Sequence, residues 1–249
     1  MIWSTLNGLS FSKRRKLIRY YYKFKTLGKT KDLNFLATIY KTDKWGKHFY
    51  TPHYFFHFLK FKNKKIKLLE IGIGGYENPQ QGGGSLRMWE RFFTKGEIYG
   101  VDIYDKTQLE EGRIMIKQGS QVDSLFLESL SEEAGGFDII IDDGSHLNEH
   151  IIFTFEVLFP KLKDNGIYVI EDVQTSYWTE FGGDPENHDS ETNAMGYFKK
   201  FIHGLNYAEF ISMDYIPTYF DKKITSIHFY HNLIFIYKGD NNEKSNMNH

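Results

Sequence analysis

The 249-residue chain has room for one large domain, or for one domain with an extension, and it can bury a substantial core. It contains no cysteine, which excludes disulfides, thiolate metal ligands and cysteine nucleophiles. No apolar run reaches the roughly 20 residues of a membrane span, and the N-terminus lacks the apolar core of a signal peptide. We therefore expect a cytoplasmic protein without a membrane span.

The net charge of −1 hides a strong division along the chain. Residues 1–67 contain 17 Lys and Arg against two acids, whereas the other residues contain 14 against 30. Basic regions of this kind bind nucleic acid, phosphate-bearing substrates or an anionic membrane surface. More often they are a solvated helix face, or an arm lying on the protein's own acidic domain, and we expect no nucleic-acid partner.

The basic region is predicted to contain two helices and a loop. Residues 10–30 have a helical pattern, with Ser10 or Ser12 as the candidate N-cap and Gly28 at the end. Residues 32–40 form the second helix, with apolar side chains on one face. Residues 42–54 are rich in hydrogen-bonding and aromatic groups and lack a simple periodicity, which is typical of a functional loop. A surface loop packed by its own aromatic side chains is the alternative.

An apolar strand beginning at Lys67 runs into the glycines Gly72, Gly74 and Gly75. Glycine lets the backbone approach a ligand closely, but the third glycine of the dinucleotide fingerprint is replaced by Glu77. Glu70 lies inside the strand instead. A carboxylate there suits a cofactor with an ammonium group and no pyrophosphate, such as S-adenosylmethionine.

The following segments continue this α/β pattern. A glycine-rich loop over 76–85 precedes a helix over 86–93, and a second strand over 99–103 contains Asp102, placed to bind ribose hydroxyls. A third strand over 113–117 is followed by Ser120 and Gln121, which are placed to line an adenine pocket, and then by a helix over 123–130.

The central strand, Phe137-Asp-Ile-Ile-Ile, ends in Asp142 and Asp143, and His146 follows one turn into the helix predicted over 148–158. In open α/β sheets, ligands bind at the carboxyl ends of the strands. After a turn at 164–166, the next strand ends in another acidic pair, Glu171 and Asp172.

The C-terminal part contains a long irregular segment, residues 174–189, which is either a mobile substrate lid or a surface excursion. We assign Gln174, Tyr177 and Trp178 in it to substrate contacts. A helix over 192–205, a strand over 210–213 and a hairpin of strands 224–230 and 233–238 follow. This order of strands and helices predicts a doubly wound sheet with a terminal antiparallel hairpin. The hairpin is the feature that distinguishes the methyltransferase form of this sheet from a plain dinucleotide-binding fold.

Two acidic pairs at neighbouring strand ends predict a divalent cation site, because hard cations such as Mg²⁺ prefer carboxylate oxygens. A bound cation lowers the pKa of a coordinated hydroxyl, and His146 is the candidate general base. Simpler readings exist for each residue: Asp143 or Ser145 caps a helix, the second pair begins a loop, and the histidine is structural.

The segments Leu69-Glu-Ile-Gly-Ile-Gly-Gly-Tyr, Gln81-Gly-Gly-Gly-Ser-Leu-Arg-Met-Trp, Asp142-Asp-Gly-Ser-His and Ile170-Glu-Asp-Val-Gln-Thr-Ser-Tyr-Trp resemble the metal-dependent sugar O-methyltransferases of macrolide biosynthesis. The resemblance is to the mycinamicin 2''-O-methyltransferase type, and it covers roughly residues 40–240. It implies a Rossmann-like class I methyltransferase fold, S-adenosylmethionine and Mg²⁺ as cofactors, and a sugar acceptor.

The resemblance also implies residue roles. It implies Mg²⁺ ligation by Asp143, Glu171 and Asp172 and general base catalysis by His146, with Asp143 also counted as catalytic. The cofactor contacts that we expect are Glu70, Gly72, Gly74, Asp102, Ser120, Gln121 and Asp142, with Thr42, Lys44, Tyr50 and Tyr54 in the segment that closes over the cofactor.

The N-terminal part departs from that family, because a basic helical arm stands where the relative has a large auxiliary domain. We expect that domain to be absent, and we assign residues 1–62 to a basic extension with the cofactor-covering loop, 63–240 to the methyltransferase domain and 241–249 to a disordered tail. The basic arm suits a nucleotide-activated sugar destined for a surface polysaccharide. We also expect a homo-oligomer. The alternatives are a metal-independent methyltransferase, a hydroxylase-like relative and a non-catalytic nucleotide-binding domain.

Overall fold

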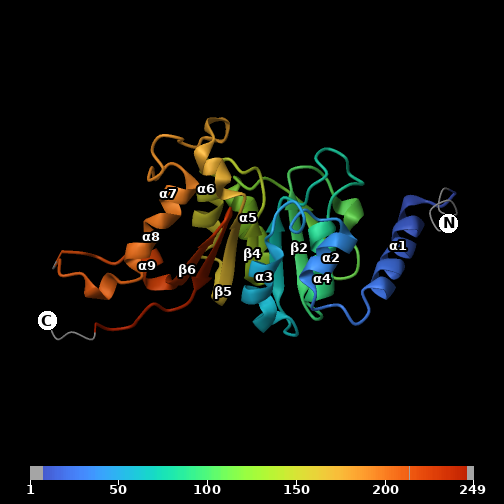
Figure 1. The fold of residues 1–249 in the computed structure, drawn as a ribbon, viewed down its shortest axis with the longest axis horizontal. Helices are drawn as coiled ribbons and strands as arrows, with labels where there is room; N and C mark the ends of the chain where they lie inside the picture. Colours follow the sequence, from blue (N-terminus) through green and yellow to red (C-terminus); the bar gives the residue numbers. More distant parts are fainter. Residues whose placement is uncertain (1–7, 213, 246–249) are drawn as a thin grey trace.

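The computed structural model describes residues 8–212 and 214–245, and its centre is a seven-stranded sheet (Figure 1). The strands are β1 Lys67–Ile71, β2 Glu97–Asp102, β3 Ile114–Gln118, β4 Phe137–Asp142, β5 Leu162–Glu171, β6 Ile224–Tyr230 and β7 Leu233–Lys238. Their order is β3-β2-β1-β4-β5-β7-β6. The first five are parallel, and β7 runs antiparallel to both β5 and β6. The doubly wound sheet with a terminal hairpin is confirmed.

Helices cover both faces of this sheet. They are α1 Phe11–Lys25, α2 Leu33–Tyr40, α3 Thr51–Phe58, α4 Gly84–Phe92, α5 Ser124–Ala134, α6 Asn148–Leu158, α7 Ala194–Lys199, α8 Phe201–Gly204 and α9 Tyr219–Lys223. One hydrophobic core joins the sheet to α2, α3 and α4, and a second joins the opposite face to α5, α6, α7 and α8. Neighbouring side chains of a strand point to opposite faces. Each acidic residue at a strand end therefore points toward one of these two cores and away from the other.

Helix α1 lies at one end of the molecule, beyond α2 and α4 (Figure 1). The predicted basic helix is confirmed, and it ends at Lys25, before Gly28 with φ +74°. Arg15 pairs with Glu111 at 3.0 Å, and Arg19 pairs with Glu90 at 2.8 Å. The arm therefore lies on acidic side chains of its own domain. Among the described residues, no helix is long and apolar enough to cross a membrane.

Some predicted boundaries were wrong. The loop predicted over 42–54 ends at Tyr50, because Pro52 near the start of α3 supplies a backbone angle suited to the first helical turn. The turn predicted at 164–166 lies within β5, where the pairing with β4 shifts register and Asn165 has φ +64°. The helix predicted over 192–205 is divided into α7 and α8, and it begins after Asn193, whose side chain caps it at Gly196 N.

The C-terminal part also differs from the sequence reading. Residues 210–212 of the predicted strand 210–213 form no strand, and Met213 lies outside the described residues. Asn241, in the predicted disordered tail, donates its side-chain amide to Asp221 O at 2.8 Å and to two neighbouring carbonyls, and its own carbonyl accepts from Tyr207. The domain therefore continues through Asn241, and residues 246–249 lie outside the described residues.

Gly72 is where the loop after β1 meets the loop after β4. It has φ +79°, and a Cβ atom built on it would lie 1.9 Å from the carbonyl oxygen of Asp143. Its N–H donates to Val101 O at 2.8 Å. The close approach of the two loops, which brings β1 and β4 side chains together, therefore requires glycine at this position.

We predict that Gly72→Ala lowers the free energy of unfolding by more than Gly74→Ala. Gly74 has a similar φ of +72° but no atom within 4 Å of its built Cβ, so it carries only the backbone strain of about 1–3 kcal/mol. Gly72→Ala adds a collision with backbone. Urea unfolding of both variants measures the difference, and equal losses would contradict the close approach of the two loops.

Candidate active site

The three predicted metal ligands lie together at the carboxyl ends of β4 and β5, as the sequence indicated. Asp143 follows β4, Glu171 is the last residue of β5, and Asp172 is the next residue. Parallel neighbours end at the same edge of the sheet, so the side chains that follow them are neighbours in space. The ammonium of Lys44 enters this group from the segment between α2 and α3.

The fourth carboxylate of the cluster is Glu70, not Asp142. Glu70 and Glu171 both face the core formed with α3 and α4, where Trp89 Nε1 donates to Glu70 Oε2 at 3.0 Å. Asp142 points to the opposite face of the sheet. The prediction that both acidic pairs join one cluster was therefore wrong for Asp142, because strand alternation separates it from Asp143.

Asp142 instead holds the loop that carries the site. Its Oδ1 accepts from Gln121 Nε2 at 3.3 Å, and Gln121 Oε1 accepts from the backbone N–H of Ser145 at 2.7 Å. The Gln121 amide also donates to Thr154 on α6 at 3.1 Å. Burial raises the pKa of Asp142 to about 7. These contacts give Asp142 and Gln121 a positioning role for residues 143–145, and their contact with a cofactor stays a prediction.

Lys44 is the only described cation inside the carboxylate cluster. Its side chain is 1% exposed, and Nζ lies 2.5 Å from Glu171 Oε1, 2.9 Å from Asp143 Oδ2 and 3.2 Å from Glu70 Oε1. Burial acts to lower the pKa of Lys44, but the three carboxylates outweigh it and raise that pKa well above its usual range. Lys44 is therefore charged at every physiological pH and holds three acids together.

The carboxylates in contact with Lys44 are held in an environment that disfavours their charge. Burial, followed by the neighbouring Asp143, raises the pKa of Glu171 well above its usual range, against the opposing effect of Lys44. Burial also raises the pKa of Asp143 and of Glu70. Tyr54, which is fully buried on α3, donates its hydroxyl to Glu171 Oε1. The cluster therefore combines several acids with few compensating groups.

Asp172 and His146 form the outer, partly exposed side of the cluster. Tyr50 OH donates to Asp172 Oδ1 at 2.6 Å, and His146 Nε2 lies 3.8 Å from Asp172 Oδ2 and 4.0 Å from Asp143 Oδ1. Burial acts to raise the pKa of Asp172, but the Tyr50 hydroxyl, His146 and His48 together lower it. Asp172 is therefore an ionised carboxylate that faces an imidazole.

His146 was predicted to lie in the helix after β4, and this was wrong. It lies in the loop before α6, which begins at Asn148. Both His146, with φ +59°, and Asp172, with φ +55°, have left-handed backbone conformations that side chains other than glycine rarely adopt. Strained residues of this kind cluster at functional sites. The conformation aims both side chains at the same point.

The residues present fit a divalent cation. Ligand atoms of Asp143, His146 and Asp172 lie within 4.8 Å of one another, and so do those of Glu70, Asp143 and Glu171. Asp143 belongs to both groups, and Lys44 already enters the second. Four carboxylates face one ammonium, and this excess of negative charge is what Mg²⁺ neutralises in oxygen-ligand sites.

The predicted cofactor residues line the neighbouring strand ends. Asp102 ends β2, and its carboxylate accepts from Ile73 N at 3.2 Å and from Tyr104 N at 3.0 Å, which fixes its position beside the glycine loop. Ser120 follows β3 and is half-buried, and Gly74 has open space around it. Thr42 is half-buried two residues before Lys44. Their contact with a cofactor stays a prediction.

The predicted substrate residues lie after β5. Gln174 follows Asp172 closely, and its Oε1 is buried without a hydrogen-bond partner among the described residues. Tyr177 and Trp178 are 38% and 44% exposed. Their segment is a pair of short 3-10 helices, Val173–Tyr177 and Thr179–Phe181, pinned by the buried amide of Asn148, which donates to Thr175 O and Phe181 O. The start of the predicted lid is therefore fixed to α6.

Three residues of this site escaped the sequence reading. His48 stacks on Tyr50 with ring centroids 4.8 Å apart, and its Nδ1 lies 3.7 Å from Asp172 Oδ1. Trp89 holds Glu70, and Asn148 holds the segment after β5. His48 lay within the loop already singled out by its composition, and Trp89 ended the motif beginning at Gln81, where it had been given no role. Asn148 had no distinguishing signal, because a helical asparagine is usually structural.

Comparisons with known proteins find O-methyltransferases similar in sequence to this chain. No family model matches it. It is 48% identical over 214 residues to demethylmacrocin O-methyltransferase of Streptomyces fradiae, and 45% identical over 214 residues to mycinamicin VI 2''-O-methyltransferase of Micromonospora griseorubida. Each match covers 85% of this chain and 54% of the relative, so the chain spans about half the length of the curated relatives it matches.

A solved structure agrees with these matches. The MycE methyltransferase of the mycinamycin pathway, in complex with Mg and SAH, superimposes with a TM-score of 0.83 at 45% identity. The superposition covers 86% of this chain and 56% of that one.

The seven-stranded sheet with its terminal hairpin, and the cluster at the ends of β4 and β5, define a class I methyltransferase fold. Over the aligned region, the chain is a homologue of the deoxysugar O-methyltransferases of macrolide and tetracenomycin pathways. The resemblance inferred from the motifs is confirmed.

The role of Lys44 can be tested with Lys44→Met. We predict that this substitution lowers the melting temperature, because a buried ion pair that loses one partner costs about 3–5 kcal/mol. Adding Mg²⁺ then raises the melting temperature of the variant by more than that of the unmodified protein, since the cation replaces the lost positive charge. Thermal melts with Mg²⁺ and with EDTA measure both effects.

Lys106→Met is the matched control. Lys106 is also fully buried, but its ammonium donates to the backbone carbonyls of Asn78 and Gln81 and pairs with no described carboxylate. This variant loses stability without recovering it in Mg²⁺. An equal response of both variants to Mg²⁺ would show that Lys44 does not share the carboxylates with the cation.

Proposed function

We propose that the protein is an S-adenosylmethionine- and Mg²⁺-dependent O-methyltransferase that methylates a sugar hydroxyl. The observation that carries this proposal is the carboxylate cluster with His146 beside it, at the strand ends where class I folds bind their ligands. The relatives named above are O-methyltransferases of sugar-bearing antibiotics, and the MycE structures hold Mg and SAH, one of them also mycinamycin VI.

The chain offers separate places for the two cofactors. Asp143, Glu171 and Asp172 would hold the cation, and the glycine loop with Asp102 and Ser120 would hold S-adenosylmethionine. When bound, S-adenosylmethionine would supply an electrophilic methyl group, and the cation would lower the pKa of a hydroxyl in contact with it. Glu70 was expected to meet the cofactor ammonium, but its carboxylate is fully buried and faces Lys44. We therefore propose that it acts through Lys44.

His146 would accept the proton of the sugar hydroxyl. Its Nε2 faces Asp143 and Asp172 at 4.0 and 3.8 Å, and its side chain is 27% exposed, so an acceptor can reach it from solvent. The two carboxylates flank its ring and orient it. The buried Gln174 Oε1, which has no partner among the described residues, is an acceptor for a neighbouring sugar hydroxyl. Tyr177 and Trp178 offer exposed aromatic surface to the sugar.

The acceptor that we propose is a sugar carrying phosphate, such as a nucleotide-activated sugar used for a surface polysaccharide. The excess of Lys and Arg in residues 1–67 supports this choice. The relatives act on sugars already attached to antibiotics, so a glycan-linked or macrolide-linked sugar is the competing acceptor class.

Calorimetric titration tests the class. We expect S-adenosylmethionine to bind, NAD⁺ not to bind, and sugar methylation to be lost in EDTA. Binding of NAD⁺, or of neither cofactor, would contradict the proposal, and methylation that persists in EDTA would make the enzyme metal-independent.

We predict that His146→Ala lowers kcat by about 10²–10⁴-fold, the usual contribution of a general base, while the affinity for S-adenosylmethionine stays unchanged. The matched control is His150→Ala, because His150 lies nearby on α6 but its Nδ1 contacts Ser145 Oγ at 2.8 Å. A near-normal rate of His146→Ala in single-turnover assays would remove His146 from the mechanism.

The acceptor class has its own test. We predict that methylation is faster with a nucleotide-linked sugar than with the same free sugar, because the phosphates add binding energy from the basic region. Competition between the two acceptors, followed by mass spectrometry of the products, measures the ratio of kcat/KM. Equal values would contradict the phosphate-bearing acceptor and leave methyl transfer intact.

A further inference from the structure

Helix α1 has an outer face that no other described part of the chain covers. Leu17, Tyr20 and Phe24 are 49%, 61% and 74% exposed, and Leu27, just beyond the helix, is 63% exposed. Their spacing of three, four and three residues places them in one stripe along the helix. Four large apolar side chains in one exposed stripe are unusual for a protein surface and mark an interaction site.

The inner face of α1 is bound to the domain, so the stripe is held in a fixed orientation. Arg15 donates to Leu109 O at 2.8 Å and pairs with Glu111, and Arg19 pairs with Glu90. Just past the helix, Thr26 is fully buried and accepts a hydrogen bond from Arg91 at 2.6 Å. Leu17 and Phe24 therefore point away from a face that is already occupied, and Tyr20 lies at the edge of the stripe, beside a groove between α1 and residues 108–111.

Four cations beside the stripe have no polar partner among the described residues. The side chains of Lys13, Arg14, Lys16 and Lys23 make no hydrogen bond or ion pair with any described residue. No acid occurs between residues 1 and 31. On the helix itself, the stripe is therefore flanked only by positive charge.

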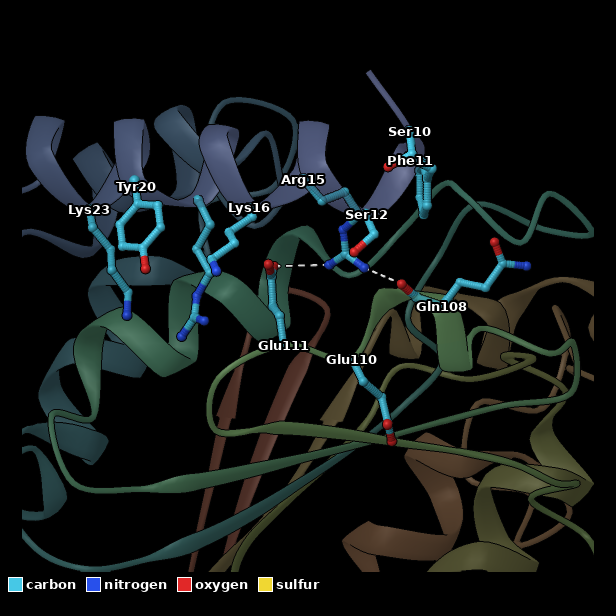
Figure 2. Close-up of a pocket in the computed structure, with 11 residues that line it drawn as sticks. Ser10, Phe11, Ser12, Arg15, Lys16, Tyr20, Lys23, Gln108, Glu110 and Glu111 are labelled. Atoms are coloured by element: carbon cyan, nitrogen blue, oxygen red, sulfur yellow. Dashed lines mark hydrogen bonds and ion pairs between the residues drawn. The ribbon is translucent and has the colours of Figure 1, made fainter. Parts of the chain in front are cut away.

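The groove runs beside α1, with cations of the helix on one side and Glu110 and Glu111 on the other (Figure 2). It has a volume of about 640 Å³ between the helix and residues 108–111. Figure 2 shows Lys16, Tyr20 and Lys23 projecting from α1 on the side of this groove, while Arg15 reaches Gln108 and Glu111 across it. The side chains of Lys16 and Lys23 border this groove without a hydrogen-bond or ion-pair partner among the described residues, so their ammonium groups are free to contact lipid phosphates at its rim.

We propose that α1 docks the protein on an anionic phospholipid surface. An exposed apolar stripe of aromatic and leucine side chains, bordered only by Lys and Arg, is the pattern of helices that lie in the membrane interface. The apolar side chains enter the headgroup region, and the lysines contact lipid phosphates. This docking does not rest on the proposed methyl transfer, because α1 shares no residue with the carboxylate cluster. It would bring the enzyme to acceptors presented at a membrane.

Vesicle co-sedimentation of the full chain tests this proposal. We expect binding to vesicles of phosphatidylcholine with 30% phosphatidylglycerol, little binding to pure phosphatidylcholine, and weaker binding at high salt. Phe24→Glu weakens binding at least about tenfold, because it removes an aromatic side chain that would be buried in the lipid contact. Leu125→Glu, at a 79% exposed leucine on α5, leaves binding unchanged. Both sites are exposed, so thermal melts of the two variants should match the unmodified protein.

Charge reversal separates the two parts of the contact. Lys16→Glu and Lys23→Glu each weaken binding at least about fivefold, whereas Lys95→Glu, at an exposed lysine after α4, does not. No binding of the unmodified protein to anionic vesicles, or equal binding by Phe24→Glu and Leu125→Glu, would overturn the proposal. So would a dimer in light scattering that Phe24→Glu dissociates without vesicles, because a second copy would then cover the stripe.

Discussion

The site depends on one interaction, the insertion of the Lys44 ammonium among Glu70, Asp143 and Glu171. These carboxylates come from β1, the end of β4 and the end of β5, so a single cation joins three strands of the sheet to the segment between α2 and α3. Without it, buried like charges at these distances would repel one another strongly. The position of the segment between α2 and α3 over the sheet and the geometry of the three acids therefore depend on each other.

Aromatic hydroxyls extend this arrangement. Tyr54, on α3, donates to the buried Glu171, and Tyr50, in the segment that carries Lys44, donates to the outer Asp172. On the opposite face of the sheet, Gln121 ties Asp142 to Ser145 and so fixes the loop that ends in His146. The acids and the imidazole are thus oriented from both cores before any ligand arrives, which is the preorganisation that catalysis by positioning requires.

The two ends of the chain serve different purposes. The terminal hairpin β6–β7 adds an antiparallel edge to the sheet beside β5, and Asn232 O in its turn accepts from Tyr50 OH at 3.2 Å, so the hairpin supports the site. Helix α1 pairs with Glu90 and Glu111 and contacts Tyr40 of α2, and it carries its exposed stripe away from the site. Chemistry and surface docking are therefore separated along the length of the molecule (Figure 1).

The local pattern of the chain was enough to determine the α/β alternation, the terminal hairpin and the acids at the ends of β4 and β5. These follow from periodicity and from the rule that parallel strands end at one edge. Tertiary structure alone decided which acids share a site, because Glu70 enters from an inner strand position while Asp142 faces away. It also decided that Lys44, 26 residues before Glu70 in the sequence, is their counter-ion. Such a pairing depends on the packing of distant segments, and no local pattern records it.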